Sequence, residues 1–275
     1  MVIVDGKNLA REILDSLKPF FAARKTAFAA ISVGGDPAAL SFIKEKSLVA
    51  GILGIEFLHF NFTPDVSNKF LRAKIGEITK RKFIKGVIIQ LPLPQKFNAQ
   101  YLLNAIPVDK DPDLLNERSF GAFLAGRFKI IPPAAETVKI ILEKYGIATK
   151  EKTCVVLGSG RLVGLPVANW LIQEKATVFV LNEFTKNPEK IAKKADIVVV
   201  GIGKPGLVTK KMIKKGAIVI DFGYGQKNGK IGGDVDFENV KRRAGLITPT
   251  PAGTGPLLVA ALFQNLRNLM KEERN

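Results

Sequence analysis

The chain contains very few of the side chains that many enzymes use for acid–base or metal chemistry. Its 275 residues include one cysteine, Cys154, and one histidine, His59. A single cysteine cannot form an internal disulfide, which excludes a disulfide-stapled secreted domain and makes the cytoplasm the expected compartment. The same scarcity argues against a histidine base, a multi-histidine metal site or a cysteine zinc cluster. Any chemistry must therefore use lysine, carboxylates, amides or a cofactor, and no metal site is expected.

Long apolar runs and acidic residues are also scarce. No apolar run approaches the roughly 18 residues of a spanning helix, and the opening M-V-I-V-D-G-K lacks a basic signal-peptide region, so no membrane partner is expected. Lys and Arg total 42 against 25 Asp and Glu, a net charge of +17 that attracts polyanions. No nucleic-acid motif or aromatic platform accompanies the basic runs at 80–82, 210–211, 214–215 and 241–243. We interpret them as a solvated face and expect no nucleic-acid partner.

The remaining composition is typical of a globular α/β protein. Hydrophobic residues make up 47% of the chain, and its length suits two domains. In the first half, the patterns predict helices at 8–21, 38–53 and 68–80 and strands at 28–33, 55–60 and 86–91. After Pro132-Pro133 they predict helices at 135–145, 163–174, 188–194 and 256–271, and strands at 153–157, 177–181, 196–201 and 216–221. Such alternation indicates parallel sheets with helices on both faces.

A glycine-rich turn joins the strand at 153–157 to the helix after it. Gly158, Gly160 and Gly164 give a G-x-G pattern with one more residue before the last glycine than the usual dinucleotide fingerprint. In such a turn, backbone amides and the helix N-terminus can face a pyrophosphate. Glu183 follows the next strand, at the distance expected for a residue that reads the adenosine ribose. The alternative interpretation is merely a tight strand-to-helix turn.

The charges around this turn bear on the choice of dinucleotide. A carboxylate at Glu183 can accept a hydrogen bond from a ribose 2′-hydroxyl but would repel a 2′-phosphate, which favours NAD. Arg161 and Lys186 favour NADP instead. NADP or NAD is therefore the expected cofactor, with the preference left open at this point.

Seven segments, in order along the whole chain, resemble the bifunctional methylenetetrahydrofolate dehydrogenase/cyclohydrolase family. They are D-G-K at 5–7, G-V-I-I-Q-L-P-L-P at 86–94, D-K-D-P-D at 109–113, G-K-P-G at 203–206, G-A-I-V-I-D-F-G at 216–223, G-D-V at 233–235 and I-T-P-T-P-A-G-T-G-P at 247–256. The resemblance implies an N-terminal three-layer α/β folate-binding domain, residues 1–131 and 256–275, to which the C-terminal helix returns. A Rossmann-type dinucleotide-binding domain, residues 132–255, lies between, with the substrate in the intervening cleft, and a homodimer is implied as well.

The resemblance also implies an activity and its residues. The reaction is oxidation of methylenetetrahydrofolate to methenyltetrahydrofolate with a nicotinamide dinucleotide, followed by hydrolysis to 10-formyltetrahydrofolate. The family's catalytic lysine corresponds to Lys46, the glutamine that binds it to Gln90 and the pterin-binding aspartate to Asp113. The other implied contacts are a folate loop of Pro251, Ala252, Gly253, Thr254 and Gly255, and a dinucleotide site of Gly158, Ser159, Gly160, Arg161, Glu183 and Tyr224.

The chain departs from the family pattern at several of these places. The active-site tyrosine is Phe42, the arginine of the phosphate loop is Ser159, and the glycine after the pterin-binding aspartate is Leu114. A P-C-T-P motif is replaced by P-P-A-A at 132–135, and P-G-G-V-G by P-A-G-T-G at 251–255. Ser159 together with Glu183 favours NAD. Phe42 can pack against a pterin but cannot donate a hydrogen bond, so we expect the dehydrogenase step to survive this change better than the cyclohydrolase step.

Each key residue also has a purely structural interpretation. Lys46 lies between charged neighbours on a helix, where lysine is usually solvated. Gln90 ends an apolar strand, and Asp113 lies in a proline-containing turn. The alternative functions are a catalytically impaired folate- or dinucleotide-binding homologue, a basic nucleic-acid module, and another two-domain Rossmann oxidoreductase, which leaves the segments at 86–94 and 109–113 unexplained.

Overall fold

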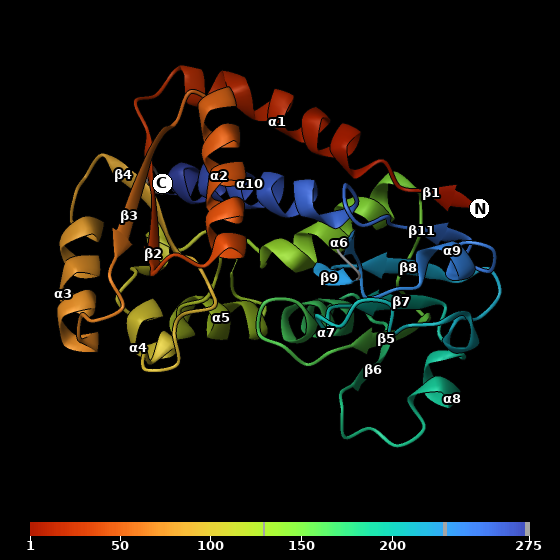
Figure 1. Cartoon of the computed structure of the whole chain (residues 1–275). Helices are drawn as coiled ribbons and strands as arrows, with labels where there is room; N and C mark the ends of the chain where they lie inside the picture. The colour runs from red at the N-terminus through yellow and green to blue at the C-terminus, as the bar shows by residue number, and fades with distance from the viewer. Residues whose placement is uncertain (129, 228–229, 273–275) are drawn as a thin grey trace. The chain divides into compact units, whose positions relative to one another are not determined.

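The computed structural model describes residues 1–128, 130–227 and 230–272, and the chain divides into two compact units (Figure 1). One unit, called here the six-stranded unit, combines Met1–Ala10 with Ala134–Leu258. The other, the three-stranded unit, combines Arg11–Pro133 with the residues from Val259 on. Two helices, α1 (Gly6–Ala22) and α10 (Thr254–Glu272), run across the divisions between these segments.

A parallel sheet of order β3-β2-β4 forms the centre of the three-stranded unit. Its strands are β2 (Ala27–Val33), β3 (Glu56–Phe62) and β4 (Ile84–Ile89). The helices besides α1 and α10 are α2 (Pro37–Ile52), α3 (Asn68–Thr79), α4 (Ala99–Leu103) and α5 (Glu117–Leu124), with a 3₁₀ turn η1 (Val108–Lys110). Asp36 and Ser67 cap α2 and α3 by accepting the N–H groups of Ala39 and Phe70.

Strand β2 is buried over its whole length because helices cover both of its faces. Ala29 and Ile31 lie in one core cluster with Ile75 of α3. Phe28 points to the other face, where its ring centroid lies 5.3 Å from that of Phe263 on α10. The uninterrupted apolar sequence of β2 follows from this burial on both faces, and it yields three layers.

The six-stranded unit contains a sheet of order β1-β11-β8-β7-β5-β6, in which every neighbouring pair is parallel. The strands are β1 (Val2–Ile3), β5 (Thr153–Leu157), β6 (Thr177–Leu181), β7 (Ile197–Val200), β8 (Ile218–Asp221) and β11 (Leu246–Ile247). The helices are α6 (Pro133–Lys144), α7 (Gly164–Gln173), α8 (Pro188–Ala192) and α9 (Phe237–Val240), with η2 (Lys210–Met212) and an antiparallel pair, β9 (Gly225–Lys227) and β10 (Lys230–Gly232).

The predicted α/β class, with parallel sheets in two units, is confirmed. Strands β5 and β6 begin and end at the predicted residues, and the other predicted elements differ by a few residues at their ends. The predicted division at 1–131, 132–255 and 256–275 differs from the observed units at the N-terminus. There β1 pairs with β11, and Val2 N donates to Gly245 O, so the first ten residues belong to the six-stranded unit. Two-residue strands carry no periodic pattern that sequence reasoning could detect.

Within the described residues, no helix is both long and apolar enough to cross a bilayer.

Candidate active site

Lys46 and Gln90 form a hydrogen bond in the three-stranded unit. Lys46 is carried by α2, Gln90 directly follows β4, and Lys46 Nζ donates to Gln90 Oε1 at 2.8 Å. The glutamine amide is fixed from its other end, because its Nε2 donates to Leu91 O at 2.8 Å. Its backbone N–H donates to Ile31 O of β2. The acceptor oxygen is therefore held toward the lysine head group.

The charges of Lys46 and Asp113 depend on each other. Burial lowers the pKa of Lys46, while the negative charges of Asp113 and Glu45 act against this shift. Burial likewise raises the pKa of Asp113, and the charge of Lys46 opposes that change. A lysine with a lowered pKa carries a larger neutral fraction, which is the form that can accept a proton.

Phe42 lies on α2 four residues before Lys46, so the two side chains share a helix face. Its ring is partly exposed. The structure thus brings together the four residues predicted for catalysis in this unit: Lys46 bonded to Gln90, Asp113 within electrostatic reach of Lys46, and Phe42 one turn away.

The acidic segment that carries Asp113 is a firmly held loop rather than a simple turn. The buried carboxylate of Asp111 accepts the N–H groups of Leu115 at 3.3 Å and Asn116 at 2.9 Å. From α10, Asn265 Nδ2 donates to Pro112 O at 2.9 Å. Leu114 has a positive φ of 54°, at the position where the family pattern has glycine. Sequence reasoning missed Asp111 and Asn265. The D-K-D-P-D segment was the available signal for Asp111, and Asn265 had none.

Lys110 anchors the same loop to the end of α3. Its buried Nζ donates to Thr79 O at 2.6 Å and to Arg81 O at 3.1 Å. Carbonyl oxygens at and beyond a helix C-terminus lack partners within the helix, and a cation satisfies them well. The segment that carries Asp113 is therefore fixed by the hydrogen bonds of two preceding charged residues, Lys110 and Asp111.

In the glycine turn of the six-stranded unit, two glycines lie in close contact with neighbouring backbone and the third faces open space. Gly158 has a φ of 106°, and a Cβ there would lie 2.3 Å from Gly201 O. A Cβ on Gly164 would lie 2.1 Å from Gly158 O, whereas one on Gly160 would meet nothing within 4 Å. The first and last glycines thus allow close backbone packing, and the middle one leaves room beside the turn. Such a turn suits a pyrophosphate next to the α7 N-terminus.

The other predicted dinucleotide residues follow strands of the same sheet. Ser159 follows β5, Glu183 follows β6 and Tyr224 follows β8, and all three are exposed. Arg161 lies in the turn before α7. Because the carboxyl ends of parallel strands meet at one edge, these residues occupy the edge where ligands of such sheets bind.

The predicted folate loop is shaped by close backbone packing. A Cβ on Gly253 would lie 2.2 Å from Pro249 O, and one on Gly6 would lie 1.8 Å from Gly253 O. The D-G-K segment therefore needs its glycine to lie against this loop. Thr254 Oγ1 donates to Asp221 O at 2.8 Å, and Ala252 has a φ of 78°.

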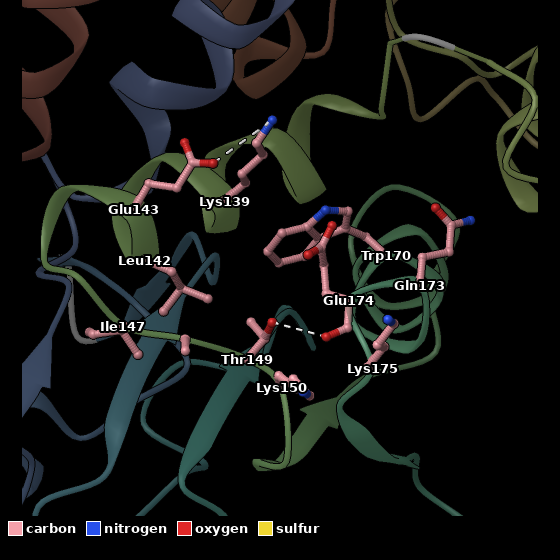
Figure 2. Close-up of a pocket in the computed structure, with 11 residues that line it drawn as sticks. Lys139, Leu142, Glu143, Ile147, Thr149, Lys150, Trp170, Gln173, Glu174 and Lys175 are labelled. Atoms are coloured by element: carbon pink, nitrogen blue, oxygen red, sulfur yellow. Dashed lines mark hydrogen bonds and ion pairs between the residues drawn. The ribbon is translucent and has the colours of Figure 1, made fainter.

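Two cavities of about 410 Å³ each lie elsewhere in the six-stranded unit. Figure 2 shows the one bordered by α6, the segment before β5 and the end of α7, where Trp170 is found. It lies beside the amino ends of β5 and β6, opposite the glycine turn. The second is lined by Glu189, Lys190, Lys193, Lys210, Lys211 and Arg243. Neither cavity contains a predicted site residue. In the described part of the chain, no cluster of His, Cys, Asp or Glu could hold a metal ion.

Two family descriptions match nearly the whole sequence. Residues 4–113 match the catalytic domain of the tetrahydrofolate dehydrogenase/cyclohydrolase family, and residues 132–274 match its NAD(P)-binding domain. The chain belongs to this family. The resemblance found in the sequence is thereby confirmed.

Known members of the tetrahydrofolate dehydrogenase/cyclohydrolase family align over 93% or more of their length. The bifunctional protein FolD of Nitratiruptor is 36% identical over 100% of this chain and 99% of its own, and that of Aquifex aeolicus is 36% identical over 96% and 93%. The crystal structure of the Campylobacter jejuni FolD enzyme has a TM-score of 0.95 at 31% identity, covering 99% of both chains. That of Trypanosoma brucei, complexed with NADP and an inhibitor, has a TM-score of 0.94 at 30% identity and covers 100% and 98%.

Asp111 gives this family member a testable pH dependence of stability. Burial, with a smaller contribution from Asp113, raises the pKa of Asp111 to about 6. Between about pH 4 and pH 6 the unfolded carboxyl therefore releases its proton while the folded one keeps it. As the pH rises from about 4 to about 6, the unfolding free energy of the wild type should therefore fall by up to about 3 kcal/mol relative to that of an Asp111→Asn variant.

Urea unfolding followed by circular dichroism at several pH values measures this difference. Asp109→Asn, which changes an exposed acid of the same loop, is the matched control. A difference between wild type and Asp111→Asn that stays constant from pH 4 to pH 7 would contradict the assignment.

Proposed function

We propose that this chain oxidises 5,10-methylenetetrahydrofolate to 5,10-methenyltetrahydrofolate with a nicotinamide dinucleotide and hydrolyses the product to 10-formyltetrahydrofolate. The observation that carries the proposal is the Lys46–Gln90 hydrogen bond with Asp113 in electrostatic reach, in a chain that belongs to a dehydrogenase/cyclohydrolase family. Relatives named bifunctional protein FolD align over 96% to 100% of the chain.

The dehydrogenase step requires mainly binding and orientation by the protein. A bound nicotinamide supplies the hydride acceptor, and the one-carbon bridge of the folate becomes a methenyl cation. Gly158, Ser159 and Gly160 would hold the pyrophosphate, with Glu183 at the adenosine ribose and Tyr224 near the nicotinamide. The open space beside Gly160 fits a group that approaches the backbone closely.

The cyclohydrolase step requires proton transfer, and Lys46 is suited to it. In its neutral form the amine accepts a proton from the water that attacks the methenyl carbon. As the C–N bond to the pterin nitrogen breaks, the same group returns a proton to that nitrogen, and the hydroxyl of the intermediate releases its own proton to water as the formyl C=O forms. Gln90 accepts one N–H of Lys46 and so directs the head group. Asp113 pairs with the pterin amino and ring N–H groups as a bidentate acceptor, while the loop at 251–255 contacts the folate.

Replacing Lys46 tests the proposed function most directly. In an initial-rate assay with methylenetetrahydrofolate and each dinucleotide, the wild type should form methenyltetrahydrofolate and then hydrolyse it. Lys46→Ala should lower the hydrolysis rate by about 100-fold or more, the range typical of a lost general base. Because burial lowers the pKa of Lys46, the wild-type hydrolysis rate should increase with pH in a range below the pKa of an ordinary lysine.

Lys44→Ala, an exposed lysine two residues earlier on α2, is the matched control and should keep both rates. Equal rates for Lys46→Ala and wild type would exclude the role given to Lys46. Absence of methenyltetrahydrofolate with either dinucleotide would instead support the alternative, a catalytically impaired homologue.

Phe42 bears on the balance between the two steps. A ring without a hydroxyl can pack against the pterin but cannot take part in proton transfer. Phe42→Tyr should therefore raise the rate of methenyltetrahydrofolate hydrolysis severalfold and leave the dehydrogenase rate nearly unchanged. Stopped-flow absorbance of preformed methenyltetrahydrofolate measures the hydrolysis alone, and an unchanged hydrolysis rate would count against this role.

For the cofactor, we infer a preference for NAD over NADP. The matching domain is described as NAD(P)-binding, and Glu183 together with Ser159 favours a free ribose 2′-hydroxyl. Glu183→Gln should raise kcat/KM for NADP relative to NAD by about tenfold, because it removes one like-charge repulsion. Glu189→Gln, another exposed acid further along the same segment, should leave the ratio unchanged. A wild-type preference for NADP would overturn the inference.

We further propose that the chain forms a homodimer and acts in the cytoplasm. Within the part of the chain that the structure describes, strand β6 pairs only with β5 and so lies at the edge of the sheet, and its Phe179 and Val180 are 45% and 41% exposed. An apolar edge of this kind suits pairing with the same strand of a second copy. A cytoplasmic enzyme agrees with the single buried thiol of Cys154.

A further inference from the structure

Two buried aspartates lie at the carboxyl edge of the six-stranded sheet. Asp221 is the last residue of β8 and is 2% exposed, and Asp234 follows β10 and is 0% exposed. Both belong to motifs already noted, G-A-I-V-I-D-F-G and G-D-V, but neither was predicted to bind or catalyse anything.

Asp221 joins the segment after β8 to the segment after β10. Its Oδ1 accepts the N–H groups of Gly223 at 2.7 Å and Asp234 at 3.3 Å, and its Oδ2 accepts that of Val235 at 3.0 Å. The neighbouring glycines make this possible, since a Cβ on Gly233 would lie 2.0 Å from Asp221 Oδ2. The carboxylate therefore supplies the hydrogen-bond acceptor that these loop N–H groups would otherwise lack.

Asp234 in turn is hydrogen-bonded to the loop after β7. Its Oδ2 accepts the N–H groups of Ile202 at 2.6 Å and Gly203 at 2.8 Å. Gly201, the residue before them, donates its N–H to Leu157 O and lies against the glycine turn, because a Cβ on Gly158 would lie 2.3 Å from Gly201 O. A continuous series of contacts thus joins the buried carboxylates to the first glycine of the turn.

Burying these two carboxylates side by side costs folding free energy, which a purely structural role does not explain. Burial, with the charge of Asp234 as a further cause, raises the pKa of Asp221 to about 6. Within the described residues, Asp234 Oδ1 is buried without a hydrogen-bond partner. Neighbouring buried charges destabilise a fold compared with apolar packing, so their presence points to a geometric requirement of the loops they hold.

We propose that Asp221 and Asp234 are positioning residues for the dinucleotide, and that they hold the loop at 201–203 against the glycine turn at Gly158. This rests on the proposed binding of a dinucleotide at that turn. Without touching the cofactor, the two carboxylates set its affinity and the alignment of its ring for hydride transfer. Hydrolysis of methenyltetrahydrofolate needs no dinucleotide and should not depend on Asp234.

The test compares Asp234→Ala and Asp234→Asn in the full chain. The alanine variant should raise the KM for the dinucleotide at least about tenfold, because two backbone N–H groups lose their acceptor. Its hydrolysis of methenyltetrahydrofolate should stay within about twofold of wild type. The asparagine variant keeps an oxygen for the N–H groups of Ile202 and Gly203, so its KM should stay within about threefold of wild type.

Asp196→Ala is the matched control at the opposite end of the sheet. Asp196 immediately precedes β7, accepts the N–H of Thr153 at 3.0 Å and pairs with Lys214 at 2.7 Å. Its removal should lower Tm without changing the KM for the dinucleotide. Thermal unfolding of every variant is measured alongside the rates.

Three outcomes would overturn the positioning role: a wild-type KM in Asp234→Ala, a parallel loss of both activities, or an equal rise of the KM in Asp196→Ala. If Asp234→Ala does not fold, Asp234→Ser takes its place, because its side chain is too short to accept the N–H groups that Asp234 Oδ2 accepts, and the same outcomes apply. Failure of the proposed function is distinguishable, because it would show as absent dehydrogenase activity in the wild type itself.

Discussion

Loops outside the strand ladders must find partners for their buried backbone N–H groups, and in this protein aspartates supply them. Asp111 does so in the three-stranded unit, and Asp221 and Asp234 do so in the six-stranded unit. The strand ladders do not satisfy these groups, because they lie outside the named strands. The shape of both loop regions that carry predicted site residues therefore depends on negative charges removed from water.

The carboxylate of Asp113 has a different environment from these three. Backbone donors offset the burial of Asp111, whereas the opposing effect at Asp113 comes from the charge of Lys46. Lys46 in turn has an amide oxygen as its hydrogen-bond partner rather than a carboxylate. A neutral acceptor directs the amine without strongly stabilising its protonated form, which leaves the lysine able to exchange its proton.

Sequence reasoning succeeded where the local apolar pattern is strong. The apolar runs of β5 and β6 predicted both strands to the residue. Burial on both faces explains the run of β5, whereas β6 is a largely exposed edge strand whose apolar side chains burial within this unit does not explain. The pairing of β1 with β11 was not predictable, since it joins two-residue strands that are far apart in the chain. Lys46 and Gln90 are 44 residues apart, and only the family resemblance, not spacing, connected them. Asp221 was recognised as a motif residue, but its role depends on contacts with the segments after β8 and β10 and, through Asp234, with the loop after β7.

The position of Trp170 has a practical consequence for observing the two units. It is the only tryptophan of the chain, it is 5% exposed, and it lies on α7, the helix that begins directly after the glycine turn. Intrinsic tryptophan emission therefore originates solely from the six-stranded unit, whereas circular dichroism senses the backbone of both. Comparing the two optical signals during denaturation separates the melting of one unit from that of the other without any added label.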